Sequence, residues 1–261
     1  MNSKRIAIIT MTTYISIMVI GIYITSNILP YNYNDFEISI SLLMTQFIAT
    51  LIIIYVVNKF YGWENAGFKK IEFNNLIWFL PYIFLIVDML YHFSQNIYLK
   101  YISFNSYTWI TLIIIFIGTL LVGFSEEVIF RGILLNSLKS EGSILKAMTL
   151  SSVGFSIIHI VNIFSGMSLL EVCIQIIEAI LLGFSFASLA IKLNNIWPII
   201  IFHAIWNFII ISSNVIGSKV PNISILCTPL NIIIGAILWI SIIKYEKNNI
   251  KASEDLVTKN I

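Results

Sequence analysis

The strongest constraint on the fold is a series of apolar segments, each about as long as a membrane-spanning helix. Crossing a bilayer takes about 20 mostly apolar residues in helical conformation, because lipid offers no partner for backbone polar groups. The sequence therefore predicts an all-α, polytopic membrane helix bundle with about eight transmembrane helices. The eight segments in the 261-residue chain are 6–29, 38–58, 76–99, 107–135, 144–164, 168–191, 197–216 and 226–244.

Composition agrees with this class. The chain is 58% hydrophobic and 11% charged, whereas a soluble domain carries about 25% charged residues. The connections are short, so we expect residues 1–245 to form a single transmembrane domain and 246–261 a cytoplasmic tail. The partner implied throughout is the lipid bilayer. A net charge of +2 gives no indication of nucleic-acid binding, and two cysteines in apolar runs indicate neither a CxxC metal site nor a disulfide framework.

Basic residues predict the orientation in the membrane, because cytoplasmic connections carry an excess of Lys and Arg. With the N-terminus inside, 12 of the 15 basic residues fall on the cytoplasmic side, two fall outside, and Arg131 lies within a span. We therefore expect a multi-pass protein of the cell membrane with both termini cytoplasmic. The 12 are Lys4, Arg5, Lys59, Lys69, Lys70, Lys139, Lys146, Lys192, Lys244, Lys247, Lys251 and Lys259, and the two are Lys100 and Lys219.

Ionisable residues inside the spans indicate where function lies, because a charge near the bilayer centre costs at least about 2.5 kcal/mol. The stretch FSEEVIFRG (124–132) places Glu126, Glu127 and Arg131 at the end of a long apolar run. In a helix, Glu127 and Arg131 form an i,i+4 pair with the acid first, the favourable order. Glu126 is rotated by about 100°, so it is free for another task such as general base. A buried ion-pair cluster that fixes helix packing remains the alternative.

Two further spans carry polar groups at helical spacing. FSIIH (155–159) contains His159, which alone is a packing residue more often than a ligand. HAIWN (203–207) places His203 and Asn207 on one helix face, where they can hold a water, a metal or a developing oxyanion, or only pack. Counted at 1.5 Å per residue, Glu126 and His159 lie ~20 Å and His203 ~17 Å from the nearest cytoplasmic lysine. This comparable depth favours one shared site.

The residue types leave the chemistry open. Glu126, His159 and His203 resemble a zinc ligand set, so a divalent metal is one candidate cofactor. The same groups can position a water without metal, with Glu126 as base and His203 and Asn207 at the oxyanion. For the other intramembrane polar residues we expect packing or solvent contact: Asp88 with His92, Glu178, and Glu171.

The three motifs in order resemble those of the CAAX-protease and bacteriocin-processing (CPBP, or Abi) family of intramembrane proteases. They are EEVIFR (126–131), FSIIH (155–159) and HAIWN (203–207), with Gly132 after the arginine and Trp197–Pro198 ahead of the last histidine. The resemblance covers about residues 107–210, which we take as the catalytic core.

What the resemblance implies is an intramembrane endopeptidase with a cavity open to the cytoplasmic side. Glu126 would act with His159, His203 and Asn207 on a nucleophilic water, while Glu127 and Arg131 support the site. Family members cleave the C-terminal tripeptide of prenylated proteins or, in bacteria, take part in peptide maturation and bacteriocin immunity. The substrate implied is thus a peptide or a protein C-terminus, with or without a lipid attached.

Two rival functions remain at this stage. The first is a non-catalytic regulatory or immunity protein that binds a peptide or a membrane partner. The second is a proton-coupled transporter, since intramembrane Asp, Glu and His can form relays, although inverted repeats and broken helices are not evident. The sequence carries no indication of an oligomeric state.

Overall fold

The computed structural model describes residues 3–28, 35–140 and 143–259, with side chains up to residue 248 except that of Asp35. Helices make up almost all of this part of the chain, which has no strand but one isolated bridge between Phe68 and Asn195. The predicted all-α bundle is confirmed. Its α-helices are α1 (Ser3–Tyr23), α2 (Asp35–Val56), α3 (Leu80–Lys100), α4 (Ser106–Glu127), α5 (Leu135–Lys139), α6 (Ile144–Ile157), α7 (Leu169–Leu193), α8 (Trp197–Val215) and α9 (Cys227–Lys259).

Shorter π and 3-10 segments extend or join these helices. The π segments are η1 (Ile24–Ile28), η2 (Val57–Tyr61) and η5 (Val128–Leu134), and the 3-10 segments are η3 (Phe73–Trp78), η4 (Tyr101–Ser103), η6 (Ile158–Ser165) and η7 (Asn222–Leu226). Because η5 joins α4 to α5 without a break, residues 106–139 run as one long apolar helix.

Seven helices in the described chain are long and apolar enough to cross a membrane, so this is a multi-pass membrane protein by length and composition. Seven of the eight expected spans coincide with them. The exception is 76–99, which corresponds to α3. This helix carries Asp88, His92, Gln95, Asn96 and Lys100, and these polar residues lower its mean hydropathy.

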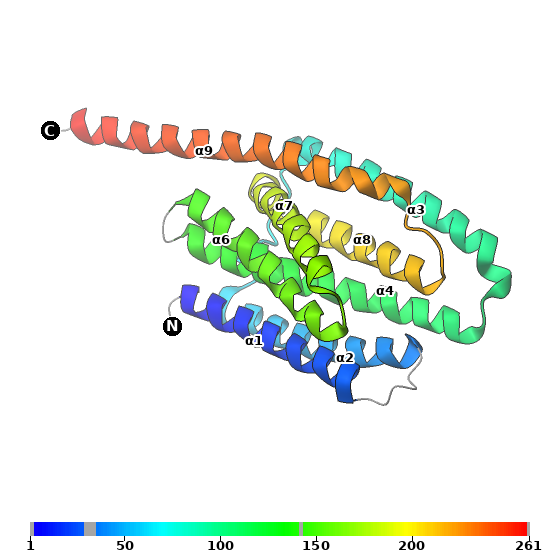
Figure 1. Cartoon of the computed structure of the whole chain (residues 1–261). Coiled ribbons are helices and arrows are strands. Elements are labelled where there is room, and N and C mark those ends of the chain that lie inside the picture. The colour runs from blue at the N-terminus through cyan, green and yellow to red at the C-terminus, as the bar shows by residue number, and fades with distance from the viewer. Residues whose placement is uncertain (1–2, 29–34, 141–142, 260–261) are drawn as a thin grey trace.

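The helices are arranged around α4 and α8. Figure 1 shows α1 and α2 along one side of the bundle, α3 and α9 along the other, and α4, α6, α7 and α8 between them. The closest helix pairs are α4 with α8, α2 with α4, α6 with α7, and α7 with α9. Both ends of the described chain lie at the same end of the bundle as the α5–α6 connection, and α9 extends beyond that end (Figure 1).

The connection between α2 and α3 covers the end of the bundle where η5 and the start of α8 lie. Its backbone pairs with the turn before α8, since Ile196 N donates to Gly67 O at 3.0 Å and Glu72 N donates to Leu193 O at 3.0 Å. Gly132 in η5 packs directly beneath it, where an added Cβ would lie 2.6 Å from Ala66 O. These contacts fix η5 and the start of α8 relative to each other.

Candidate active site

The segment that carries Glu126, Glu127 and Arg131 is the most enclosed part of the molecule. All seven residues of η5 are buried, and so are Ser125, Glu126 and Glu127 at the end of α4. The wider π turn begins directly after the two glutamates. Short π segments within α-helices are frequent at functional sites, and here the segment carries the arginine of the motif.

A glycine one turn before the glutamates lets α4 and α8 approach closely. A Cβ added to Gly123 would lie 3.0 Å from both Ala204 N and Ile200 O on α8. This close packing brings the side chain of Glu127 to that of His203, the residue before Ala204. The backbone contact thus sets the distance between two of the three motifs.

Glu127 and Arg131 form the predicted ion pair. Arg131 Nη1 donates to Glu127 Oε1 at 3.1 Å and lies 3.0 Å from Oε2, and both side chains are fully buried. The guanidinium carbon lies 4.1 Å from the ring centre of Phe155, a cation–π contact. Because Arg131 Nε and Nη2 have no hydrogen-bond partner in the described protein, the ring and the carboxylate are the groups that stabilise this charge.

His203 lies between the two carboxylates. Its Nδ1 is 2.8 Å from Glu127 Oε1, and its Nε2 is 3.7 Å from Glu126 Oε2. A carboxylate oxygen accepts hydrogen bonds, so the shorter distance fits a hydrogen bond from His203 Nδ1–H to Glu127. Such a bond orients the imidazole ring and directs its other nitrogen, Nε2, toward Glu126.

Glu126 is held from α1 and α2, which the sequence motifs do not include. Tyr14 OH lies 3.3 Å from both Glu126 Oε1 and Gln46 Oε1, and Gln46 Nε2 donates to Leu121 O at 3.2 Å. The other carboxylate oxygen, Oε2, is buried without a hydrogen-bond partner in the described chain. Sequence reasoning missed Tyr14 and Gln46, although a glutamine in the middle of an apolar span was a usable signal.

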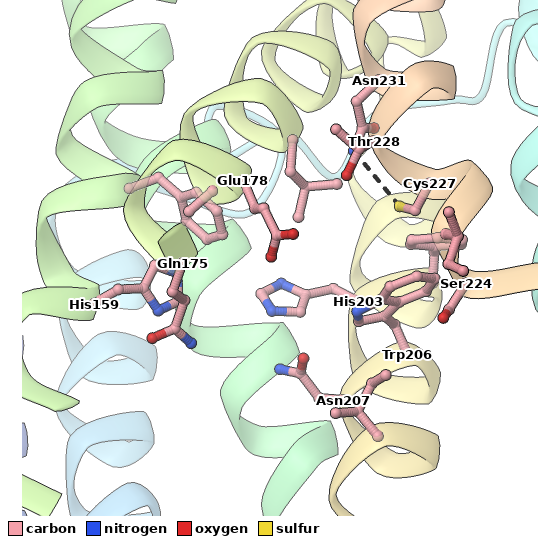
Figure 2. Close-up of a pocket in the computed structure, with 16 residues that line it drawn as sticks. His159, Gln175, Glu178, His203, Trp206, Asn207, Ser224, Cys227, Thr228 and Asn231 are labelled. Atoms are coloured by element: carbon pink, nitrogen blue, oxygen red, sulfur yellow. Dashed lines mark hydrogen bonds between the residues drawn. The ribbon is translucent and has the colours of Figure 1, made fainter. Parts of the chain in front are cut away.

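A cavity of about 580 Å³ is lined by His203 but not by Glu126 or Glu127. Figure 2 shows His159 and His203 facing this space, with Asn207 one turn along α8. Among the residues that line the cavity, polar or titratable side chains are His159, Gln175, Glu178, His203, Asn207, Ser224, Cys227, Thr228 and Asn231, together with the indole of Trp206. The lining runs from α6 and η6 across α7 and α8 to η7 and the start of α9.

His159 occupies the second residue of η6, where the helix tightens from α to 3-10 geometry. Its ring meets Phe155 edge to face at 5.4 Å, and the ring of His203 meets Phe155 at 5.8 Å. Phe155 thus contacts both imidazoles as well as the Arg131 guanidinium. The two histidines of the motifs share one aromatic neighbour and one cavity.

These residues fall in a region with known relatives. Residues 107–209 match the family model described as type II CAAX prenyl endopeptidase, Rce1-like. The predicted resemblance to CAAX proteases is confirmed. The matched segment contains all six motif residues and indicates an intramembrane protease of the CAAX type. A comparison with curated proteins found no match.

The Rce1-like segment brings the candidate residues together in two groups. Glu126, Glu127, Arg131 and His203 form a continuous chain of polar contacts. His203 also lines the cavity with His159 and Asn207. No hydrogen bond or ion pair links His159 to Glu126 among the described side chains. His203 is therefore the residue that connects the glutamates to the cavity.

The expected metal ligands do not form a ligand set in this arrangement. Within the described residues there is no group of three His, Cys, Asp or Glu side chains that could hold a metal ion. Glu126 and His203 approach each other, but His159 lies across Phe155. A metal requirement therefore stays a prediction, and chelation of the purified protein tests it.

The remaining intramembrane polar residues lie in different environments. Asp88 and His92 form the expected i,i+4 pair at 3.6 Å, with side chains 29% and 55% exposed, and neither lines the cavity. Glu171 forms a capping box with Ser168 at the start of α7. Glu178, for which packing or solvent contact was expected, lines the cavity.

Proposed function

We propose that this protein hydrolyses a peptide bond within the membrane, with Glu126 as the base that activates a water. The observation that carries the proposal is the unpartnered Oε2 of Glu126, buried 3.7 Å from His203 Nε2 inside the segment that matches the Rce1-like family. Two acceptors at this separation can both take a hydrogen bond of about 2.8 Å from one water. The base and the imidazole would then hold a single nucleophile.

The other contacts suit supporting roles. Glu127 would orient the imidazole through Nδ1, and Arg131 would hold the Glu127 side chain in place through the ion pair. Tyr14 would hold the first oxygen of Glu126 so that the second faces the water. When the water attacks the carbonyl carbon, its proton passes to Glu126, and the same carboxyl returns a proton to the leaving amine.

His159 and Asn207 would stabilise the tetrahedral intermediate from the cavity. A carboxamide N–H and a neutral imidazole N–H are both donors, and donors aimed at the developing oxyanion lower the barrier more than they stabilise the ground state. The substrate would be a peptide or protein C-terminus, with or without a lipid, in the cell membrane of a bacterium. Peptide maturation or bacteriocin immunity would be its role, with both termini cytoplasmic.

Access to the cavity from the cytoplasmic side stays a prediction of the resemblance, and one feature argues against it. Ser224 and Ile225 of the lining lie in η7, which follows α8, whereas Lys192, expected on the cytoplasmic side, lies at the end of α7, before α8. If the start of α8 is cytoplasmic, the cavity extends toward the outer half of the membrane. Thiol labelling of η7 in intact cells therefore tests the side of access separately.

The proposal is tested by cleavage of a synthetic peptide library by the purified protein in detergent. We expect wild type to cleave, and both Glu126→Ala and His203→Ala to lose activity by ~10²-fold or more, the range that a general base contributes. His92→Gln, outside the cavity, is the matched control and should keep wild-type activity. Cleavage that survives in both active-site variants would refute the assignment. A cellular phenotype that persists in Glu126→Gln would favour the non-catalytic immunity role instead.

A further inference from the structure

Glu178 is the carboxylate of the cavity that the proposed reaction does not use. It lies near the middle of α7, and Figure 2 shows its side chain projecting into the space in front of His203. Its side chain is exposed, and no hydrogen bond or ion pair holds it in the part of the chain that the structure describes. A carboxylate within a spanning helix is costly unless it faces water or a counter-charge.

The cavity supplies no counter-charge of its own. Its described lining includes neither Lys nor Arg. His203 contacts both Glu126 and Glu127, and the guanidinium of Arg131 pairs with Glu127. With neutral imidazoles, the site therefore holds three carboxylates against one fixed positive charge. A cleft lined by one sign of charge attracts ligands of the opposite sign.

The aromatic part of the cavity lining also suits the apolar stem of a cationic side chain. Trp206 and Phe202 both line the cavity, stacked at 5.7 Å with 22° between their rings. Lys and Arg lay their methylene stems along such surfaces and place the charged head at an acceptor, and aromatic faces attract the cation itself. A cavity lined by both a carboxylate and aromatic rings thus matches one chemical class of ligand.

We propose that Glu178 determines substrate specificity by binding a cationic group next to the scissile bond, a Lys or Arg side chain or a free amino terminus. This inference rests on the proposed protease function. The preferred substrate is therefore an apolar peptide or protein C-terminus with a cationic group beside the cleaved bond.

The test uses pairs of synthetic peptides that differ at one position beside the cleavage site found with the library. The pair compares lysine with norleucine, which keeps the apolar stem and removes the charge. A charge-assisted hydrogen bond corresponds to a preference of ~10- to 100-fold. We expect wild type to favour the lysine peptide in kcat/KM by that factor, Glu178→Gln to bring the ratio to about one, and Glu178→Lys to favour a glutamate peptide.

Glu171→Gln is the matched control, because Glu171 is a carboxylate of the same helix that is held by Ser168 away from the cavity. It should keep the wild-type preference. Equal cleavage of both peptides by wild type, or an unchanged preference in Glu178→Gln, would overturn the inference.

A binding measurement separates this inference from the proposed function. Thermal stabilisation of Glu126→Ala by the uncleaved lysine and norleucine peptide amides reports recognition without catalysis. Stronger stabilisation by the lysine peptide, lost when Glu178→Gln is added, would support the cation site even if no peptide is cleaved. Equal stabilisation by both peptides would reject it.

Discussion

Removal of the buried guanidinium gives the sharpest test of how the site is held together. In Arg131→Met, the carboxylate of Glu127 loses its ion pair at 3.0 Å in a position with no exposed surface. Breaking a buried pair from one side costs about 3–5 kcal/mol, because the partner is left as an uncompensated charge. The lost cation–π contact with Phe155 adds up to ~2 kcal/mol. We expect the free energy of unfolding of Arg131→Met to fall by the sum of these two contributions.

The double variant distinguishes charge pairing from simple packing. Glu127→Gln alone leaves Arg131 unpaired and should cost a similar ~3–5 kcal/mol. Arg131→Met with Glu127→Gln leaves neither charge behind, and the carboxamide oxygen introduced at position 127 can still accept from His203 Nδ1. The decrease in the free energy of unfolding of the double variant should therefore be about half the sum of the decreases in the two single variants. A double-mutant cycle measures this coupling. Tryptophan fluorescence during SDS unfolding of the purified protein provides the free energies.

Asp88→Asn is the internal control, since it breaks another i,i+4 acid–base pair, partly exposed and 3.6 Å long. Exposed pairs contribute about 0–1 kcal/mol. The reasoning is refuted if Arg131→Met costs no more than this control, or if the losses of the two buried variants simply add.

Four further predictions concern the site. Tyr14→Phe removes the hydroxyl 3.3 Å from Glu126 Oε1, and we expect kcat to fall by ~10-fold or more with KM unchanged in the cleavage assay. Gly123→Ala places a Cβ 3.0 Å from the α8 backbone and should abolish cleavage. Gly118→Ala is the control: the nearest atom to its added Cβ is 3.9 Å away, so cleavage should stay at the wild-type level. In a cysteine-free background, Ser224→Cys should react with a membrane-impermeant thiol reagent from outside intact cells. Dialysis against a chelator should abolish cleavage, and zinc should restore it, if Glu126, His159 and His203 hold the divalent metal that their residue types allow.

Each of these has an outcome that contradicts it. A raised KM in Tyr14→Phe would place the hydroxyl at the substrate and not at the base. Equal activity of the two glycine variants would mean that the helix approach does not set the site. Labelling of Ser224→Cys only in inverted vesicles would show that the cavity opens to the cytoplasmic side. Cleavage that survives chelation would contradict the metal and favour a water held by the protein side chains alone.

The sequence alone determined the class of fold, and it also supplied the candidate site residues. Apolar segments of about 20 residues can only be spanning helices, so the bundle and most of its helices were predictable from length and hydropathy. The Glu127–Arg131 pair was also predictable, because helical spacing is local and four residues bring two side chains together. The three motifs indicated the family match over residues 107–209 because they lie in order along the chain.

Only the tertiary structure decided how those residues are arranged relative to one another. The placement of His203 between two carboxylates depends on the approach of α4 to α8 at Gly123, a contact between helices that hydropathy cannot specify. The contribution of Tyr14 to Glu126 joins positions 112 residues apart. Glu178 looked like an ordinary packing residue until the cavity was seen. Local spacing follows from the geometry of one helix, whereas these relations follow from how several helices pack.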